Sequence, residues 1–318
     1  MIITVTMNPA IDKTVVLGSF LHGGLNRIED ILLDAGGKGI NVSKTIKALE
    51  GESIATGFVG GNNGKAITQM LQNDGVCTDF VVVDGETRVN TKIAETDGTV
   101  TELNEAGPYV TEEEQEQLIQ KLMEYANEDT WFVLSGSVPA GVPKTIYGDI
   151  IRKVHEKGGK VFLDADGELF TQALSAKPDV IKPNRVALEK YIGAKHSLNK
   201  EELLSAGQTL LEQGIGTVII SLGQEGALFM TNGLTLTCPA MSVRVQSTVG
   251  AGDALVAAFT YGRDRGEDLS FCAKLGIATS AGAVATEGTK PPTWETIDEL
   301  LQFVRVEWQK KDEQLSNC

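Results

Sequence analysis

The chain has few basic residues for its length, and this shortage limits the partners that it can bind. It holds 28 Lys and Arg residues against 43 Asp and Glu residues, which gives a formal net charge of −15 and a pI near 4.7. Nucleic acids and anionic membranes are bound by positive surfaces. Neither is therefore an expected partner, and an anionic small molecule would need a local cluster of cations.

Cysteine, histidine and long apolar runs are also scarce. Cys77, Cys238, Cys272 and Cys318 lack CxxC spacing, and the three histidines form no metal-ligand pattern. A disulfide framework and a zinc site are therefore not expected, and a reducing cytoplasm fits best. No apolar run reaches the length of a membrane span, and the N-terminus lacks the features of a signal peptide. Residues 1–6 instead predict a first strand.

Short β-branched runs recur along the chain with helical patterns between them. These runs cover residues 54–59, 131–134, 160–163, 180–181 and 217–221. Such alternation is typical of βαβ units and predicts an α/β fold with a mostly parallel central sheet. Thr111 and Glu114 fit a capping box before one of the helices. Three helical patterns, at 250–266, 269–286 and 294–306, end the chain.

Two segments interrupt this alternation because neither contains a plausible crossover helix. Residues 13–34 are strand-like with a break at Gly23-Gly24, and residues 87–103 read as two strands joined at Asp97-Gly98, a signal for a type I′ hairpin. We expect these segments to form a small antiparallel β lid on a core of residues 1–12, 35–86 and 104–318. The outer face of this lid would be either a homodimer surface or a solvated sheet face.

A glycine-rich turn before an apolar helix is the most informative chemical signal. The turn is Ser247-Thr248-Val249-Gly250-Ala251-Gly252-Asp253, and strong helix formers follow it. Free backbone N–H groups at a helix start attract anions, and Asp253 is placed to take a proton from an attacking hydroxyl. The alternative is that Asp253 only caps the helix and complements its dipole.

A second glycine-rich loop supplies the equipment for a sugar. Gly37 and its neighbouring glycines surround Lys38, Asn41 follows, and Asp12 lies just beyond the first strand. Ligands of open parallel sheets bind beyond the carboxyl ends of the strands. Asp12 and Asn41 are suited to sugar hydroxyls, although an ordinary turn before a helix is the alternative.

Cations on one strand are candidates for binding a substrate phosphate. Arg88, Asn90 and Lys92 alternate along the strand and therefore point the same way. Together with Lys38, and with Arg27 as a weaker candidate, they would bind phosphate through an arginine fork and lysine point charges. The alternative is a solvated strand face.

The motifs together resemble the ribokinase-like family of sugar kinases, from Met1 to about Val304. Within that family the resemblance is to the phosphosugar branch, which contains the 1-phosphofructokinases and the tagatose-6-phosphate kinases. The matching motifs are Thr6-Met7-Asn8-Pro9-Ala10-Ile11-Asp12, Gly36-Gly37-Lys38-Gly39-Ile40-Asn41, Thr87-Arg88, Ser135-Gly136-Ser137, Lys182-Pro183-Asn184, Ser221-Leu222-Gly223 and Val249-Gly250-Ala251-Gly252-Asp253.

The resemblance implies a three-layer α/β sandwich whose β lid often serves in dimerisation. It implies ATP-dependent, Mg²⁺-assisted phosphorylation of D-fructose 1-phosphate to fructose 1,6-bisphosphate. Phosphorylation of tagatose 6-phosphate is the alternative within the branch, and a catalytically weak sugar-phosphate sensor is the alternative of another class.

The resemblance also implies roles for individual residues. Asp253 matches the catalytic base, and Gly250, Ala251 and Gly252 match the anion hole for the transferring phosphoryl group. The substrate set is Asp12, Gly37, Asn41, Arg88 and Ser137, with Lys38 and Lys92 added on the charge argument above. The nucleotide set is Lys182, Asn184, Ser221, Gly223 and Gly226.

Two positions depart from the family pattern. Ser247 stands where many relatives carry Asp, and a neutral residue there is common in the phosphosugar branch. Ala187 stands where the family usually places a glutamate that helps to organise the metal, three residues after Asn184. Either another acid or water substitutes for that glutamate, or metal binding is weak, so no metal ligand is assigned.

Overall fold

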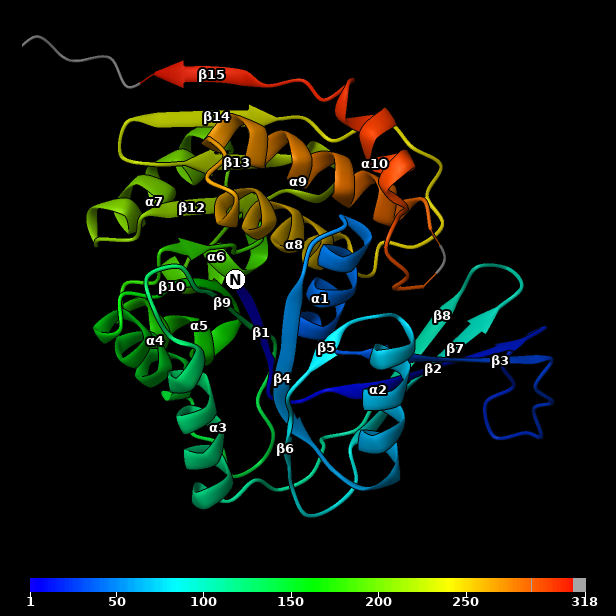
Figure 1. The fold of residues 1–318 in the computed structure, drawn as a ribbon. Coiled ribbons are helices and arrows are strands. Elements are labelled where there is room, and N and C mark those ends of the chain that lie inside the picture. Colours follow the sequence, from blue (N-terminus) through cyan, green and yellow to red (C-terminus); the bar gives the residue numbers. More distant parts are fainter. Residues whose placement is uncertain (287, 311–318) are drawn as a thin grey trace, which may run out of the picture.

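The core of the molecule is one long β-sheet with helices on both faces (Figure 1). The computed structural model describes residues 1–286 and 288–310, with side chains as far as residue 308. The sheet order is β15-β14-β13-β12-β11-β10-β9-β1-β4-β5, and β6 also pairs with β4. The parallel strands are β1 (Ile2–Thr6), β4 (Ser53–Val59), β5 (Cys77–Thr78), β6 (Val81–Val82), β9 (Trp131–Ser135), β10 (Lys160–Asp164), β11 (Val180–Ile181) and β12 (Thr217–Ser221), and the antiparallel ones are β13 (Ala227–Met230), β14 (Leu234–Cys238) and β15 (Glu307–Lys310).

Two helical layers bury the central strands, whose residues are apolar on both faces, as in other covered parallel sheets. One layer contains α1 (Lys38–Ala48), α8 (Ala251–Asp264), α9 (Leu269–Val284) and α10 (Trp294–Leu301). The other contains α3 (Glu112–Tyr125), α4 (Ile146–Glu156), α5 (Gly167–Leu174), α6 (Arg185–Ile192) and α7 (Lys200–Glu212). Helix α2 (Gly61–Asn73) packs near the lid. The predicted α/β sandwich is confirmed, and so is the capping box of Thr111 and Glu114.

The lid is a four-stranded sheet that extends beyond the helical layers (Figure 1). Its order is β3-β2-β7-β8, with β2 at Ala10–Leu17, β3 at Asp30–Gly36, β7 at Arg88–Glu95 and β8 at Val100–Asn104. The two outer pairings are antiparallel, and β2 pairs in parallel with β7. The first lid segment was expected at residues 13–34, but β2 begins at Ala10 and β3 ends at Gly36. The lid strands therefore extend farther into the core than expected, and Asp12 lies on a lid strand.

The hairpin between β7 and β8 is present, but the predicted type I′ turn is wrong. Gly98 N–H donates to Glu95 O, and Glu95 N–H donates to Thr99 O, each at 2.9 Å. A type I′ turn needs positive φ at both central residues. Gly98 has a φ of 91°, whereas Asp97 is not among the described non-glycine residues with positive φ. The Asp97 carboxylate instead accepts a hydrogen bond from Thr99 N–H at 2.8 Å, and the connection is a three-residue loop that ends in glycine.

The C-terminal third differs from its predicted pattern. The first two helices form as α8 and α9, but the third helix, α10, ends at Leu301 rather than near residue 306. The chain then adds β15 antiparallel to β14 at the edge of the main sheet. Strands β13 and β14 were not predicted either. No described helix has the length and apolar character needed to cross a membrane.

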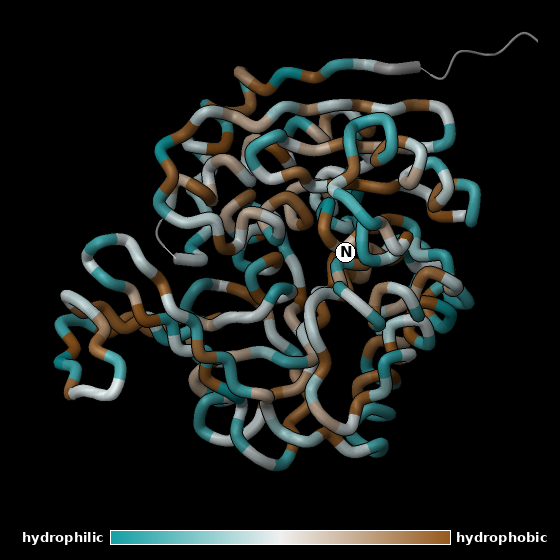
Figure 2. The backbone as a smooth tube through the Cα atoms, turned by 180° about the vertical axis from the view of Figure 1, so that it is seen from behind, coloured by the Kyte–Doolittle hydropathy of each residue, from teal (hydrophilic) through white to brown (hydrophobic). Residues whose placement is uncertain are grey.

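Hydrophobic side chains remain exposed on the lid. Ile31, Leu33 and Leu103 are 45%, 55% and 56% exposed. Leu33 and Leu103 belong to the same cross-strand row, with Lys13 and Thr91 between them. Figure 2 shows hydrophobic segments on the lid where it projects from the body. One face of the lid is therefore partly apolar rather than uniformly polar.

Candidate active site

A cavity of about 560 Å³ lies where the lid meets the carboxyl ends of the parallel strands. Thr6, Ser135, Asp164 and Ser221 are the last residues of β1, β9, β10 and β12, and all four line this main cavity. Their convergence follows from the parallel sheet, in which strand ends meet at one edge. The lid contributes the opposite wall through β2, β7 and β8.

Most of the predicted site residues line the main cavity. The lining includes Asp12, Gly37, Lys38, Asn41, Arg88, Lys92, Ser137, Lys182, Asn184, Ser221, Gly250, Gly252 and Asp253. Ala251 is the first residue of α8, between two lining glycines, but does not itself line the cavity. Gly223, Gly226 and the exposed Arg27 also lie outside the lining. At Gly226 a Cβ would lie only 2.0 Å from Cys238 O, so close packing already requires glycine there.

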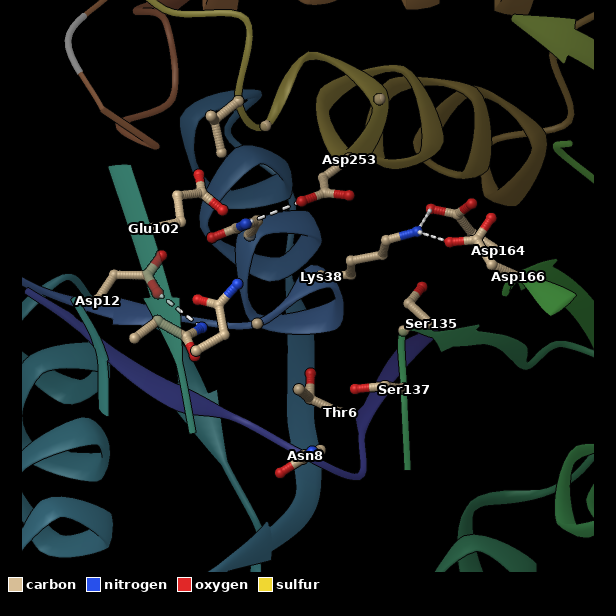
Figure 3. A pocket seen from close by; sticks show the side chains of 18 of the residues that line it. Thr6, Asn8, Asp12, Lys38, Glu102, Ser135, Ser137, Asp164, Asp166 and Asp253 are labelled. Carbon is tan, nitrogen blue, oxygen red and sulfur yellow. Dashed lines mark hydrogen bonds and ion pairs between the residues drawn. The ribbon is translucent and has the colours of Figure 1, made fainter. Parts of the chain in front are cut away.

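The glycine-rich turn starts α8 as predicted and brings its N-terminus to the main cavity. Gly250 is the N-cap residue, in the left-handed conformation with a φ of 84°. Asp253 lies in the first turn of α8 and is only 8% exposed. Its Oδ2 accepts a hydrogen bond from Asn41 Nδ2 at 2.8 Å (Figure 3). The carboxylate is thus fixed by a side chain of the second glycine-rich segment.

The environment of Asp253 favours its neutral form. Burial and the nearby carboxylate of Asp164 raise its pKa to about 6. The hydrogen bond from Asn41 and the charges of Lys38 and Lys182 act in the opposite direction but do not cancel this shift. A carboxylate with such a pKa is ionised at neutral pH and is still basic enough to accept a proton from a reacting hydroxyl.

A charged cluster that the sequence analysis did not find lies beside Asp253 (Figure 3). Asp164 is buried and contacts Lys182 Nζ at 3.1 Å and Lys38 Nζ at 3.5 Å. Lys38 also lies 3.5 Å from Asp166. Burial acts to raise the pKa of Asp164, but the two lysines outweigh it and hold the pKa below its usual value. The sequence offered one signal for this acid, because Asp164 directly follows the predicted strand at 160–163.

Lys38 keeps its proton in this cluster. Burial acts to lower its pKa, but Asp164, Asp166 and Asp253 together raise the pKa above its usual value. Lys38 and Lys182 therefore provide two fixed positive charges next to the start of α8. Each of these lysines is already paired with a carboxylate of the cluster, so an anionic ligand would compete with Asp164 and Asp166 for them.

The lid wall combines hydrogen-bonding groups of both kinds. Asp12 accepts from Asn90 Nδ2 at 3.2 Å and lies 3.5 Å from Lys92 Nζ. The Arg88 guanidinium donates to the carbonyl oxygens of Asn8, Pro9 and Glu105. The parallel register of β2 and β7 places Ala10 beside Arg88 and Asp12 beside Asn90. Glu102 and Asn104, from β8, complete this wall and were not predicted.

Helix α1 contributes three polar side chains at a spacing of three residues. Lys38 contacts Asp164 and Asp166 of the charged cluster, and Asn41 holds Asp253. Lys44 forms an ion pair of 2.7 Å with Asp34 of the lid. The other oxygen of the Asp34 carboxylate accepts from Thr289 Oγ1 at 3.0 Å. This helix therefore connects the charged cluster, the start of α8 and the lid.

Several buried polar atoms of the main cavity have no partner among the described residues. They are Thr6 Oγ1, Asn8 Oδ1, Asn41 Oδ1, Asn90 Oδ1 and Ser135 Oγ. Buried polar groups in native proteins are rarely left without a hydrogen bond. These atoms belong to residues of the cavity wall, which is therefore rich in hydrogen-bonding groups.

Comparison with known proteins identifies the class to which this fold and cavity belong. Residues 5–297 match the model of the pfkB family carbohydrate kinases. The chain belongs to this family and is a sugar kinase.

Proteins named 1-phosphofructokinase resemble the chain over almost its whole length. The 1-phosphofructokinase of Haemophilus influenzae is 36% identical over 307 residues, which cover 96% of this chain and 97% of the relative. The 1-phosphofructokinase of Bacillus subtilis is 34% identical, with coverage of 96% and 99%. Among solved structures, Escherichia coli phosphofructokinase-2 in complex with substrates and products superposes with a TM-score of 0.90 at 26% identity, covering 95% of this chain and 98% of that one.

Proposed function

We propose that this protein transfers the γ-phosphoryl group of ATP to D-fructose 1-phosphate and produces fructose 1,6-bisphosphate. The observation that carries the proposal is the buried Asp253 carboxylate at the start of α8, held by Asn41 and facing a cavity of hydrogen-bonding groups. The similarity to 1-phosphofructokinases over nearly the full chain supports the choice of sugar.

Asp253 is proposed to act as the general base. It accepts the proton of the C6 hydroxyl, which increases the nucleophilicity of that oxygen. The oxygen then forms a bond to the γ-phosphorus while the bond from this phosphorus to the β–γ bridging oxygen breaks, and ADP leaves. The N–H groups of Gly250, Ala251 and Gly252 would stabilise the developing negative charge from the helix start. Phosphoryl transfer requires mainly positioning and charge neutralisation, and both are available here.

The lid wall is proposed to hold the sugar phosphate. Asp12, Asn41 and Ser137, with the backbone at Gly37, would contact hydroxyl groups, because they offer acceptors and donors at the cavity wall. Arg88 and Lys92 would neutralise the 1-phosphate from the neighbouring strand.

Lys182, Asn184 and Ser221 are proposed to contact ATP, with Lys38 beside its phosphates. These residues follow β11, end β12 or begin α1, at the edge where nucleotides bind in such sheets. Gly223 and Gly226 would shape the adjoining loop. The described cysteines are free thiols, which supports a cytoplasmic location.

The oxygen-rich wall of the main cavity fits a Mg²⁺ ion that arrives with ATP. The described residues contain no group of three or more His, Cys, Asp or Glu side chains that would hold a metal by themselves. Mg²⁺ on nucleotides commonly uses one or two carboxylates, and its other ligands are phosphates and waters. Asp164, Asp166 and the partnerless hydroxyl of Ser135 are oxygen donors of the suitable kind. The ion would neutralise charge on the phosphates.

A comparison of sugars tests the proposed substrate. The purified protein is expected to consume ATP fastest with fructose 1-phosphate, with kcat/KM at least about 10-fold above the values for tagatose 6-phosphate and fructose 6-phosphate, because discrimination of this size needs only about 1.4 kcal/mol. A coupled ADP assay measures all three. Higher kcat/KM with tagatose 6-phosphate would change the substrate, and thermal stabilisation by sugar phosphates without turnover would identify a sensor.

We also propose that two copies associate through the lid. The exposed Ile31, Leu33 and Leu103 support a protein contact, because exposed apolar patches mark interaction surfaces. Sedimentation equilibrium is expected to give a dimer for the native protein and a monomer after Leu33→Asp. An unchanged dimer in that variant would place the interface elsewhere.

A further inference from the structure

A second cavity, of about 620 Å³, adjoins the main cavity between α5 and α6. Asp166 and Asn184 line both cavities, so they lie at the boundary between them. Ala187, where a longer acidic side chain was expected, lines the second cavity. Among the described lining residues of this cavity, Asp166 is the only acid.

The Asp166 carboxylate is not committed to a structural task. It is the N-cap residue of α5, yet its side chain makes no capping hydrogen bond. Its side chain is 65% exposed, and its one ion-pair partner among the described residues is Lys38, at the long distance of 3.5 Å. Asp164, in contrast, is 4% exposed and is held between two lysines. Asp166 is therefore the acid of this cluster that is freest to take a new partner.

A buried serine hydroxyl is a second observation that points to a ligand at this place. Ser135 is 1% exposed, and its Oγ has no hydrogen-bond partner. The parallel register sets Ser135 beside Asp164 at the strand ends. Figure 3 shows its hydroxyl on the same side of the main cavity as Asp164 and Asp166. A buried hydroxyl without a partner is costly, so a bound ion's water or a phosphate oxygen is expected to meet it.

We propose that Asp166 is the carboxylate that positions the nucleotide-bound Mg²⁺ in this chain, from the α5 side of the boundary rather than from position 187 on α6. The inference rests on the proposed ATP-dependent function. The carboxylate would leave its long contact with Lys38 and accept hydrogen bonds from the ion's waters or bind the ion directly, and Lys38 would turn to the phosphates. A hard divalent cation prefers such an oxygen donor.

The test measures the Mg²⁺ dependence of nucleotide binding rather than turnover. Binding of the non-hydrolysable analogue AMP-PNP is followed by titration calorimetry over a range of Mg²⁺ concentrations. Asp166→Asn is expected to raise the Mg²⁺ concentration for half-maximal binding about 10-fold, the lower end of what loss of a metal-orienting partner costs. With Mn²⁺ replacing Mg²⁺, the electron paramagnetic resonance spectrum of the bound ion is expected to change in the same variant.

A relocation variant makes the test specific to position. Adding Ala187→Glu to Asp166→Asn places an acid on the α6 side of the second cavity. This double variant is expected to return the Mg²⁺ concentration for half-maximal binding most of the way to the native value. Glu201→Gln is the control, because Glu201 is an exposed acid on α7 that lines neither cavity. We expect less than a twofold change for this control.

The possible outcomes separate this inference from the proposed function. If Asp166→Asn leaves the Mg²⁺ dependence unchanged while the native protein phosphorylates fructose 1-phosphate, the role of Asp166 is wrong and the function stands. If the native protein binds no AMP-PNP at any Mg²⁺ concentration, both are wrong. An equal loss in Asp166→Asn and in Glu201→Gln would also overturn the inference, because it would report only surface charge.

Discussion

Replacing Asp253 with Asn is expected to lower kcat by about 10²–10⁴-fold, the range that positioned general bases contribute. The amide keeps the size of the carboxyl group, and its Oδ1 can still accept the hydrogen bond from Asn41 Nδ2. It cannot take the proton of the attacking hydroxyl. Binding of fructose 1-phosphate, measured by calorimetry, is expected to change less than threefold.

The same substitution is expected to stabilise the protein at neutral pH. Folding raises the pKa of Asp253 from 3.8 to about 6, so ionising this group costs the folded state roughly 2–3 kcal/mol at pH 7. The cost is absent below about pH 4, increases between about pH 4 and 6, and is complete above that range. Urea unfolding of Asp253→Asn and the native protein is therefore expected to differ at pH 7 and to agree near pH 4.

The pH profile of the native enzyme provides the control for this assignment. If Asp253 is the base, kcat/KM falls as the pH falls through about 6, because protonation removes the acceptor. The residual activity of Asp253→Asn would lack this acid limb. Near-native turnover of the variant, or an unchanged acid limb, would contradict the assignment of Asp253 as base.

Asp164→Ala is expected to lower the free energy of unfolding by about 3–5 kcal/mol, the cost of leaving a buried charge without its partner. Asp164 and Lys182 are 4% and 7% exposed and lie 3.1 Å apart. The alanine would remove the only carboxylate that directly contacts the buried Lys182 ammonium among the described residues. Urea unfolding at pH 7 measures the loss directly.

An exposed ion pair provides the matched comparison for Asp164→Ala. Arg152 and Asp149 are closer, at 2.6 Å, but their side chains are 52% and 42% exposed. Asp149→Ala is therefore expected to cost less than about 1 kcal/mol. Replacing both members of the buried pair, by Asp164→Leu with Lys182→Met, is expected to recover part of the lost stability. Equal losses in the two single variants would show that burial does not set the cost.

The sequence predicted those parts of the molecule that local patterns determine. Glycines before an apolar helix predicted the start of α8 at Gly250, and alternation along one strand predicted that Arg88 and Lys92 face one cavity. Recurrent β-branched runs predicted the parallel sheet. In each of these cases the signal lies within a short stretch of the sequence and needs no distant contact to be recognised.

Features that depend on contacts between residues far apart in the chain could not be predicted from the sequence. Asp164 and Asp166 acquire their neighbours only when β10 is placed beside β9 and α1, so no local pattern distinguishes them from other acids near strand ends. The type I′ turn was predicted from Asp97-Gly98 alone, but the pairing of Glu95 with Thr99 selects a three-residue loop. Strand β15 forms because β14 leaves an edge that it can pair with.

The spacing of Lys38, Asn41 and Lys44 on α1 restricts how the length of this chain can vary during evolution. Each residue of an α-helix is turned by about 100° from the one before it. One residue inserted between Lys38 and Lys44 would therefore rotate the two ends of α1 relative to each other and separate contacts that serve three different regions. Insertions and deletions are better tolerated in the exposed loop at 18–29 than in this helix.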